Sequence, residues 1–482
     1  MKISREHIPH PFYDRLLQWT LAATLIFTPL AFGTVEVWSI AVAELLVLSM
    51  VVVWIGRTIF EGRIQFEQTA LNAPILLFLA LILFQMLPMP LTVIKHLSPA
   101  AHAVYREVES AFSSEIRWRT ISLDQHATRE EFLKVLTYSM LFWVVLNNFR
   151  RRKQIQGVVV IIIAMGFLLA VFGIIQKYSW NGKMYWIREL KQGGVPFGPY
   201  VNKNHFAGYM EIAIPLTIGY LLAQSPRRGD PLTLRERLRL WTSEQTSKSV
   251  LLIFAAIFMA ASLILSDSRG GLVSFAASMV FFSFMIRIKR SPGRKGSRLI
   301  LAFCGLGLIA AVWIGGSTAF VSMERLEKGI QEPSGEERLV VWQDTFRLAK
   351  DYLRFGSGFN TFEEVFPAYK TSTRQVIFQY AHNDYLQLLA EGGAVALGIV
   401  IWLFVAWYRA VIARRLKERG SFLVHMTVAG MSAVFAILLH SFTDFNLHIP
   451  ANAIAIVTVL AVTLNAVRVA RGDEELNSRK IP

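Results

Sequence analysis

The sequence is poor in cysteine and in charged residues. It has one cysteine, Cys304, among 482 residues, and only 17% of the chain is charged. A single cysteine excludes a disulfide within the chain, and its place in an apolar run is typical of a buried thiol. Soluble proteins carry about 25% charged residues. Hydrophobic residues make up 54% of the chain. Their distribution therefore decides between an unusually apolar soluble protein and a membrane protein.

Long apolar runs recur from one end of the chain to the other. A membrane-spanning helix needs about 20 mainly apolar residues, and about twelve runs come close to that length. The first run has no small-residue cleavage site and another follows at once, which argues against a cleaved signal peptide. We therefore predict an all-α polytopic membrane protein with about 12 transmembrane helices, in one membrane domain over residues 1–482. The predicted spans are Leu16–Val35, Val37–Ile55, Leu71–Ile94, Phe132–Phe149, Val158–Ile175, Phe206–Leu222, Val250–Leu265, Leu272–Ile286, Leu299–Ala319, Tyr385–Trp407, Phe422–Leu439 and Ile449–Val467.

Basic residues are unevenly distributed between the predicted loops. The net charge is +16, but Lys and Arg concentrate at the N-terminus and in alternate loops, as in Arg150–Lys153 and Arg409–Arg419. The positive-inside rule accounts for this distribution and puts both termini in the cytoplasm, with the basic clusters facing anionic lipid. The charge therefore does not indicate a nucleic-acid partner.

The largest loop on the opposite, outer side covers residues 321–381. Ser334, followed by Glu337 three residues later, forms a capping box that predicts a helix start. Apolar residues at spacings of three and four then predict an amphipathic helix that ends before Gly356. We expect this helix to lie on the membrane surface against the bundle. Its predicted apolar face is Leu339, Trp342, Phe346, Ala349 and Leu353.

Polar residues continue from this loop into the tenth span. Asn383, Gln387 and Glu391 are four residues apart and fall on one helix face. Polar groups in a membrane helix are costly, which favours a position facing a cavity or the protein interior. His382 lies at the outer end of the stripe, and an imidazole accepts a proton near neutral pH. A helix cap with hydrogen bonds between helices explains the same pattern without a site.

Two arginines lie at predicted helix starts on the outer side. Arg269 stands in a hairpin before Gly270 and Gly271, where a guanidinium and free backbone N–H groups suit an anion. Pairing with Asp267, or contact with lipid headgroups, explains Arg269 equally well. Arg338 opens the amphipathic helix, where a cation opposes the helix dipole unless an anionic partner is present.

Two more outer segments are polar. Asn202, Lys203 and His205 lie at the outer end of the sixth span. His440 and Asp444 end the eleventh span, and their spacing suits a hydrogen-bonded pair or two metal ligands. Of these, we favour a structural pair.

Several phosphate and metal motifs are missing from the sequence. The outer loops contain no closely spaced Asp-x-Asp pair, and the chain has no Walker-type phosphate loop and no Cys/His zinc cluster. If the protein acts on a phosphorylated substrate, arginine must supply the positive charge.

Taken together, these segments resemble the O-antigen ligase and polymerase superfamily of bacterial envelope membrane proteins. The resemblance is strongest over residues 197–452. Many ligases have Gly, Thr or Tyr where this chain has Ala396, so the choice between ligase and polymerase stays open. The resemblance rests on Tyr200–Gly208, Ser266–Gly271, Glu337 and Arg338 with Trp342, His382 and Asn383 with Gly393, and His440–Asn446.

The resemblance implies transfer of a glycan from an undecaprenyl-diphosphate carrier at the periplasmic face of the inner membrane. The acceptor would be lipid A-core in a ligase or a growing glycan in a polymerase. By the same resemblance, Arg269 and Arg338 bind the diphosphate, His382 is the base, and the reaction inverts the anomeric centre without a metal or other cofactor. We assign substrate binding to Lys203, Asn202, His205, Asn383, Gln387, Glu391, His440 and Asp444.

Other functions fit parts of the pattern. A polymerase of capsule or exopolysaccharide repeat units, or a ligase that attaches glycans to protein, would share these motifs. A transporter could use the intramembrane carboxylates Glu44, Glu211 and Glu391, but paired broken helices are not evident in the two halves. A membrane scaffold would not need so many polar residues at one end of the bundle.

Overall fold

The structure is a computed structural model of the chain and is built almost wholly of helices. It describes residues 11–62, 66–112, 117–190, 195–224, 244–289, 335–372, 377–412 and 422–478.

Eight helices in the described part of the chain are long and apolar enough to cross a membrane, fewer than the 12 predicted. The predicted spans Leu16–Val35 and Phe132–Phe149 overlap helices α1 (Pro11–Leu30) and α6 (Gln125–Asn148). These two helices are not among the eight that are apolar enough to span a membrane. The predicted span Leu299–Ala319 lies outside the described residues. The eight are α2 (Val37–Glu61), α7 (Arg152–Tyr178), α8 (Lys203–Gln224), α10 (Glu244–Leu265), α11 (Arg269–Lys289), α16 (Asp384–Ile412), α17 (Phe422–His440) and α18 (Pro450–Ser478).

The predicted span Leu71–Ile94 is wrong at its C-terminal end. Helix α3 (Asn72–Gln85) is only 14 residues long. Proline lacks a backbone N–H and pushes the preceding residue toward an extended conformation, so Pro88 and Pro90 end the helical stretch. Strand β1 (Met89–Pro90) then pairs antiparallel with β2 (Trp118–Arg119). Ile94 belongs instead to the next helix, α4 (Leu91–Leu97).

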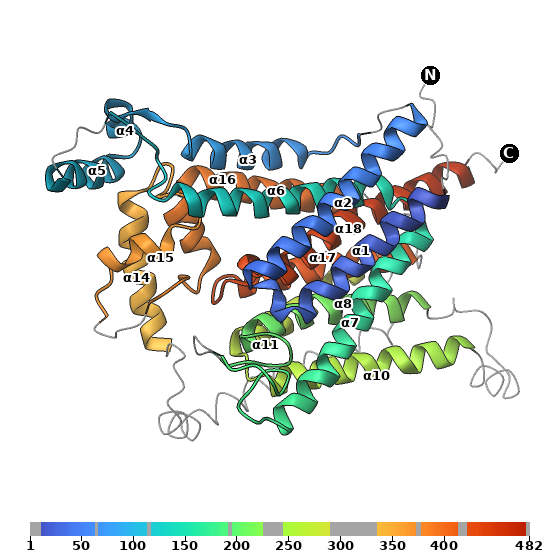
Figure 1. Ribbon diagram of the computed structural model, residues 1–482. Coiled ribbons are helices and arrows are strands. Elements are labelled where there is room, and N and C mark those ends of the chain that lie inside the picture. The colour runs from blue at the N-terminus through green and yellow to red at the C-terminus, as the bar shows by residue number, and fades with distance from the viewer. Residues whose placement is uncertain are drawn as a thin grey trace, which may run out of the picture.

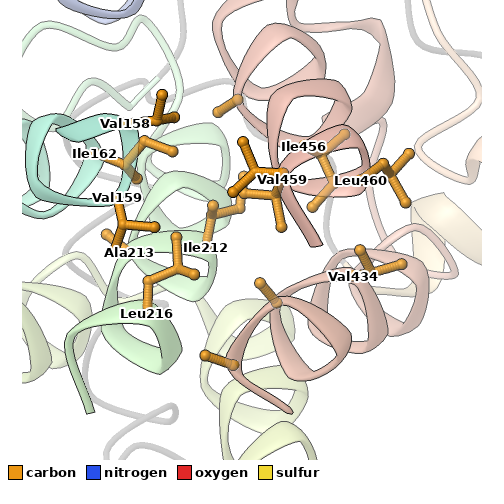
Figure 2. Close-up of a cluster of buried hydrophobic side chains, with 14 of the residues drawn as sticks. Val158, Val159, Ile162, Ile212, Ala213, Leu216, Val434, Ile456, Val459 and Leu460 are labelled. Carbon is orange, nitrogen blue, oxygen red and sulfur yellow. The ribbon is translucent and has the colours of Figure 1, made fainter. Parts of the chain in front are cut away.

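Helices α8, α17 and α18 form the centre of the bundle. In their most apolar stretches 78–83% of the residues are buried, against 22–28% in α2, α10 and α16. Helices α8 and α17 pack so closely that their contact needs a small residue, because a Cβ at Gly219 would lie 2.6 Å from the Cβ of Ala429. Figure 2 shows part of the core that results, in which aliphatic side chains of α7, α8, α17 and α18 converge. Those labelled there are Val158, Val159, Ile162, Ile212, Ala213, Leu216, Val434, Ile456, Val459 and Leu460.

Short helices gather at one end of the bundle, here called the distal end. It lies opposite the end at which α1 begins and α18 ends (Figure 1). There, α4, α5 (Pro99–Phe112), α14 (Gly335–Asp351) and α15 (Phe362–Val365) share a second apolar core that includes Tyr105, Leu348, Tyr352, Phe362 and Phe366.

Helix α14 confirms the amphipathic helix predicted in the large loop, but the buried face differs from the predicted one. Val341, Leu348 and Tyr352 are buried together with Ala349 of the predicted face, whereas Leu339 and Phe346 of that face are about half exposed. The reason is that both faces carry apolar residues, and spacing alone does not tell which one meets the protein. The exposed stripe is suited to the membrane surface, where we expect the helix to lie.

Candidate functional site

The site is built around the turn that joins α17 to α18, residues 440–448, here called the α17–α18 turn. Asp384, the first residue of α16, holds both ends of this turn. Its Oδ2 accepts a hydrogen bond from Ser441 Oγ at 2.7 Å, and its Oδ1 lies 2.7 Å from His448 Nδ1. Burial alone would lower the pKa of His448, but Asp384 outweighs that effect and raises it. The turn is therefore fixed to α16 by a buried carboxylate.

Asp444 lies at the middle of the turn and is fully buried. Its Oδ1 is 3.5 Å from His382 Nδ1 and 3.8 Å from His205 Nε2, while Asn204 Nδ2 donates to its Oδ2. Burial raises the pKa of the Asp444 carboxyl, but the two imidazoles outweigh burial and hold this pKa well below its ordinary value. The Asp444 carboxyl thus faces two histidines from different elements, and these favour its ionised form.

His382 is held in an uncommon backbone conformation beside Asp444. Its φ is +51°, in the left-handed region that residues other than glycine seldom adopt. Trp342 Nε1 of α14 donates to its carbonyl at 3.3 Å, and its ring meets the edge of Phe445. The His382 side chain is 14% exposed, against 6% for His205. Of the two imidazoles, His382 is therefore the more accessible to a ligand.

Arg338 and the hairpin that contains Arg269 adjoin the same turn near Thr443. Arg338 Nη1 donates to the Thr443 carbonyl at 3.0 Å. Arg269 begins α11 with an exposed side chain, and the next residue, Gly270, packs against the turn. A Cβ at Gly270 would lie 2.5 Å from Thr443 Oγ1 and 3.0 Å from His440 Nε2. Residues from three distant parts of the sequence therefore adjoin one turn.

Gly270→Ala is expected to destabilise the protein, because the added methyl group has no room against the turn. Overpacking of this kind costs about 1–3 kcal/mol. Gly157→Ala is a matched control in α7, since a Cβ at Gly157 meets nothing within 4 Å. The measurement is the midpoint of thermal unfolding in detergent. Equal midpoints for the two variants would contradict the close packing of α11 against the turn.

The predicted pairing of His440 with Asp444 is wrong. The carbonyl of His440 accepts from the Asp444 N–H, but the two side chains have separate partners. His440 Nδ1 lies 2.9 Å from Glu211 Oε1 of α8, and both side chains are buried. The physical reason is that α17 ends at His440, so the helical spacing does not continue. Among the described residues, no three His, Cys, Asp or Glu side chains are arranged to hold a metal ion.

The polar stripe of α16 binds the protein's own backbone. Asn383 Oδ1 caps the helix by accepting from the N–H groups of Tyr385 and Leu386. Gln387 Oε1 accepts from Ala381 N at 3.0 Å, and Glu391 Oε1 accepts from Phe362 N at 3.0 Å. These contacts match the alternative of a cap with structural hydrogen bonds. They place Gln387 and Glu391 against the large loop.

The predicted residues of α8 lie at the start of that helix. Asn202 Oδ1 accepts from Asn204 N at 2.8 Å, and Lys203 is buried, with its backbone N–H bonded to the Val195 carbonyl. The His205 side chain reaches Asp444.

Asn204, Thr443 and Phe445 were missed by the sequence reasoning. Asn204 stands between two predicted residues, so its position offered a signal. Phe445 packs against both His382 and His205, with ring centroids 5.0 and 4.7 Å away. Thr443 acts through its carbonyl, which no side-chain pattern reveals.

The central part of the chain matches a known family. Residues 254–403 match the family model described as O-Antigen ligase. This match supports membership of the O-antigen ligase and polymerase superfamily. Together with the apolar helices, the match supports an O-antigen ligase-like, glycan-processing membrane protein. No curated protein matches the chain.

The O-antigen ligase match includes Arg269, Arg338 and His382 but not the elements on which they rest. The α17–α18 turn and α8 lie outside the matched residues. The candidate site therefore also includes Asp444 and His205, from parts of the chain that flank the match.

Proposed function

We propose that the protein transfers a glycan from an undecaprenyl-diphosphate carrier to an acceptor hydroxyl at the periplasmic face of the bacterial inner membrane. The observation that carries the proposal is the convergence of His382, Arg338 and the Arg269 hairpin on the α17–α18 turn. The turn lies at the distal end, and the distribution of basic residues supports a periplasmic position for that end.

His382 is the proposed general base. With Asp444 facing Nδ1, the favoured tautomer carries its proton on that nitrogen, which leaves the Nε2 lone pair to accept one. His382 takes the proton of the acceptor hydroxyl as its oxygen attacks the anomeric carbon. The bond from that carbon to the diphosphate oxygen breaks, and undecaprenyl diphosphate leaves with the electron pair. A single displacement of this kind inverts the anomeric centre.

Arg269 and Arg338 are proposed to stabilise the leaving diphosphate. A guanidinium donates two parallel hydrogen bonds to phosphate oxygens, and the charge to be stabilised grows as the bond breaks. Arg269 also stands at the N-terminus of α11, where backbone N–H groups and the helix dipole favour an anion. The two arginines thus supply the positive charge in a metal-independent transfer.

Deletion of the gene tests the proposal and separates its two versions. The lipopolysaccharide, the secreted polysaccharide and the carrier-linked glycan of the deletion strain are analysed. Loss of O-chain with full-length polymer left on the carrier identifies a ligase, whose acceptor is lipid A-core. Glycan limited to a single repeat identifies a polymerase. Unchanged glycans in all three fractions would overturn the proposal.

A further inference from the structure

One charged and hydroxylated surface near the site is not used by the proposed mechanism. Glu131, Lys134 and Tyr138 lie at spacings of three and four on α6, and so share one face of that helix. Glu131 and Lys134 form an ion pair, and each side chain is 13% exposed. These three residues are here called the α6 polar face.

Tyr380 connects the α6 polar face to the site. Its ring stacks on Phe445 with centroids 4.3 Å apart, and Phe445 in turn packs against His382. Helix α6 packs against α18, the helix that follows the turn, and the charges of Lys134 and Glu131 lower and raise, respectively, the pKa of Tyr380, which burial raises overall. The α6 polar face therefore borders the half of the α17–α18 turn that contains Phe445 and His448.

The two arginines border the other half of the turn. Arg338 contacts Thr443, and Gly270 packs against Thr443 and His440. His382 faces Asp444, between the two halves. The turn thus has a cationic side, suited to a diphosphate, and a second side of mixed charge and hydroxyl groups.

The hydroxyls of Tyr138 and Tyr380 have hydrogen-bonding capacity to spare. Neither hydroxyl has a hydrogen-bond partner among the described residues. The fully buried side-chain atoms without a hydrogen-bond partner do not include either of these oxygens. Neither hydroxyl oxygen is therefore completely enclosed by the described residues. The Glu131–Lys134 pair is neutral overall, so it attracts neither a phosphate nor a cation strongly. A carboxylate that accepts, together with an ammonium and phenols that donate, suits adjacent sugar hydroxyls.

We propose that the α6 polar face and Tyr380 bind the acceptor saccharide and hold its reacting hydroxyl beside His382. This inference rests on the proposed function, because it assigns the second substrate to the same site. Donor and acceptor would then approach the α17–α18 turn from opposite halves, so that the hydroxyl and the carrier-linked sugar meet at His382.

The test is steady-state kinetics of the full chain in lipid nanodiscs. The donor is carrier-linked glycan extracted from the deletion strain, and the acceptor is the unmodified acceptor from the same strain. Tyr380→Phe and Tyr138→Phe remove one hydroxyl each and keep the rings. Each is expected to raise the acceptor KM about three- to tenfold, the range for one hydrogen bond, with kcat and the donor KM within twofold of wild type. The double variant Glu131→Gln, Lys134→Met should raise the acceptor KM further.

Two conservative variants serve as controls. Glu130→Gln alters the neighbour of Glu131, and the Glu130 side chain is 56% exposed. Tyr178→Phe alters a tyrosine that is 73% exposed. Both should keep the wild-type acceptor KM. If wild type transfers glycan while Tyr380→Phe and Tyr138→Phe leave the acceptor KM unchanged, or lower kcat alone, the acceptor site is wrong and the proposed function stands. If wild type transfers nothing from this donor to this acceptor, the proposed function itself fails.

Discussion

His382→Ala is expected to reduce glycan transfer by at least about 10²-fold, the low end of what a general base contributes. The variant should still insert and fold, because the His382 ring is partly exposed and its hydrogen bond to Trp342 runs through the backbone carbonyl. The measurement is transfer in the deletion strain carrying the variant gene, normalised to the amount of protein in the membrane fraction.

The control for this substitution is His126→Ala. His126 lies at the start of α6 with a side chain that is 81% exposed, so its loss should leave transfer at the wild-type level. Full transfer by His382→Ala would remove this residue as the base. Loss of the protein from the membrane would instead assign His382 a structural role.

Much of the helix pattern could be predicted from the sequence, because an apolar run of sufficient length has few alternatives to a helix in a membrane. The prediction was less accurate where local chemistry interrupts such a run. Pro88 and Pro90 cut the third predicted span to the short helix α3. Helix α6 begins with charged residues, including Glu131 and Lys134, and is not among the eight helices apolar enough to span a membrane.

The site residues could be named from the sequence more readily than their partners. His382, Arg338 and Asp444 are of the types that carry proton transfer and anion binding, and all three adjoin the α17–α18 turn. The partners depend on tertiary packing. Asp444 faces two histidines from distant parts of the chain, whereas His440 pairs with Glu211. Spacing along one helix could not reveal either arrangement, because α17 ends between the two residues.

The environments of the buried carboxylates also bear on the choice between transferase and transporter. Glu211 is paired with His440, and Glu391 accepts a backbone hydrogen bond from Phe362 in the large loop. Each carboxylate thus stabilises a contact between elements of the distal end. A binding site for a transported ion would need such groups to be free to exchange partners, so these contacts favour the transferase.

Arg338→Ala and Arg269→Ala are each expected to reduce transfer by about 10²- to 10³-fold, the cost of removing one donor aimed at developing charge. Arg338 Nη1 is engaged by the Thr443 carbonyl, while its Nε is buried and has no hydrogen-bond partner among the described residues. A guanidinium fixed at one nitrogen, with donors to spare, is prepared for an anionic partner. Transfer is again measured in the deletion strain at matched protein levels.

Substitution by lysine separates the guanidinium's shape from its charge. An ammonium is a point charge and cannot hold both the Thr443 carbonyl and two oxygens of a diphosphate in one plane. Arg338→Lys and Arg269→Lys should therefore recover less than about a tenth of wild-type transfer. The matched control is Arg347→Lys on the same helix α14, where the arginine is 60% exposed and pairs with Asp344. Wild-type transfer by Arg338→Lys would show that charge alone suffices and that the proposed two-point contact with the leaving group is absent.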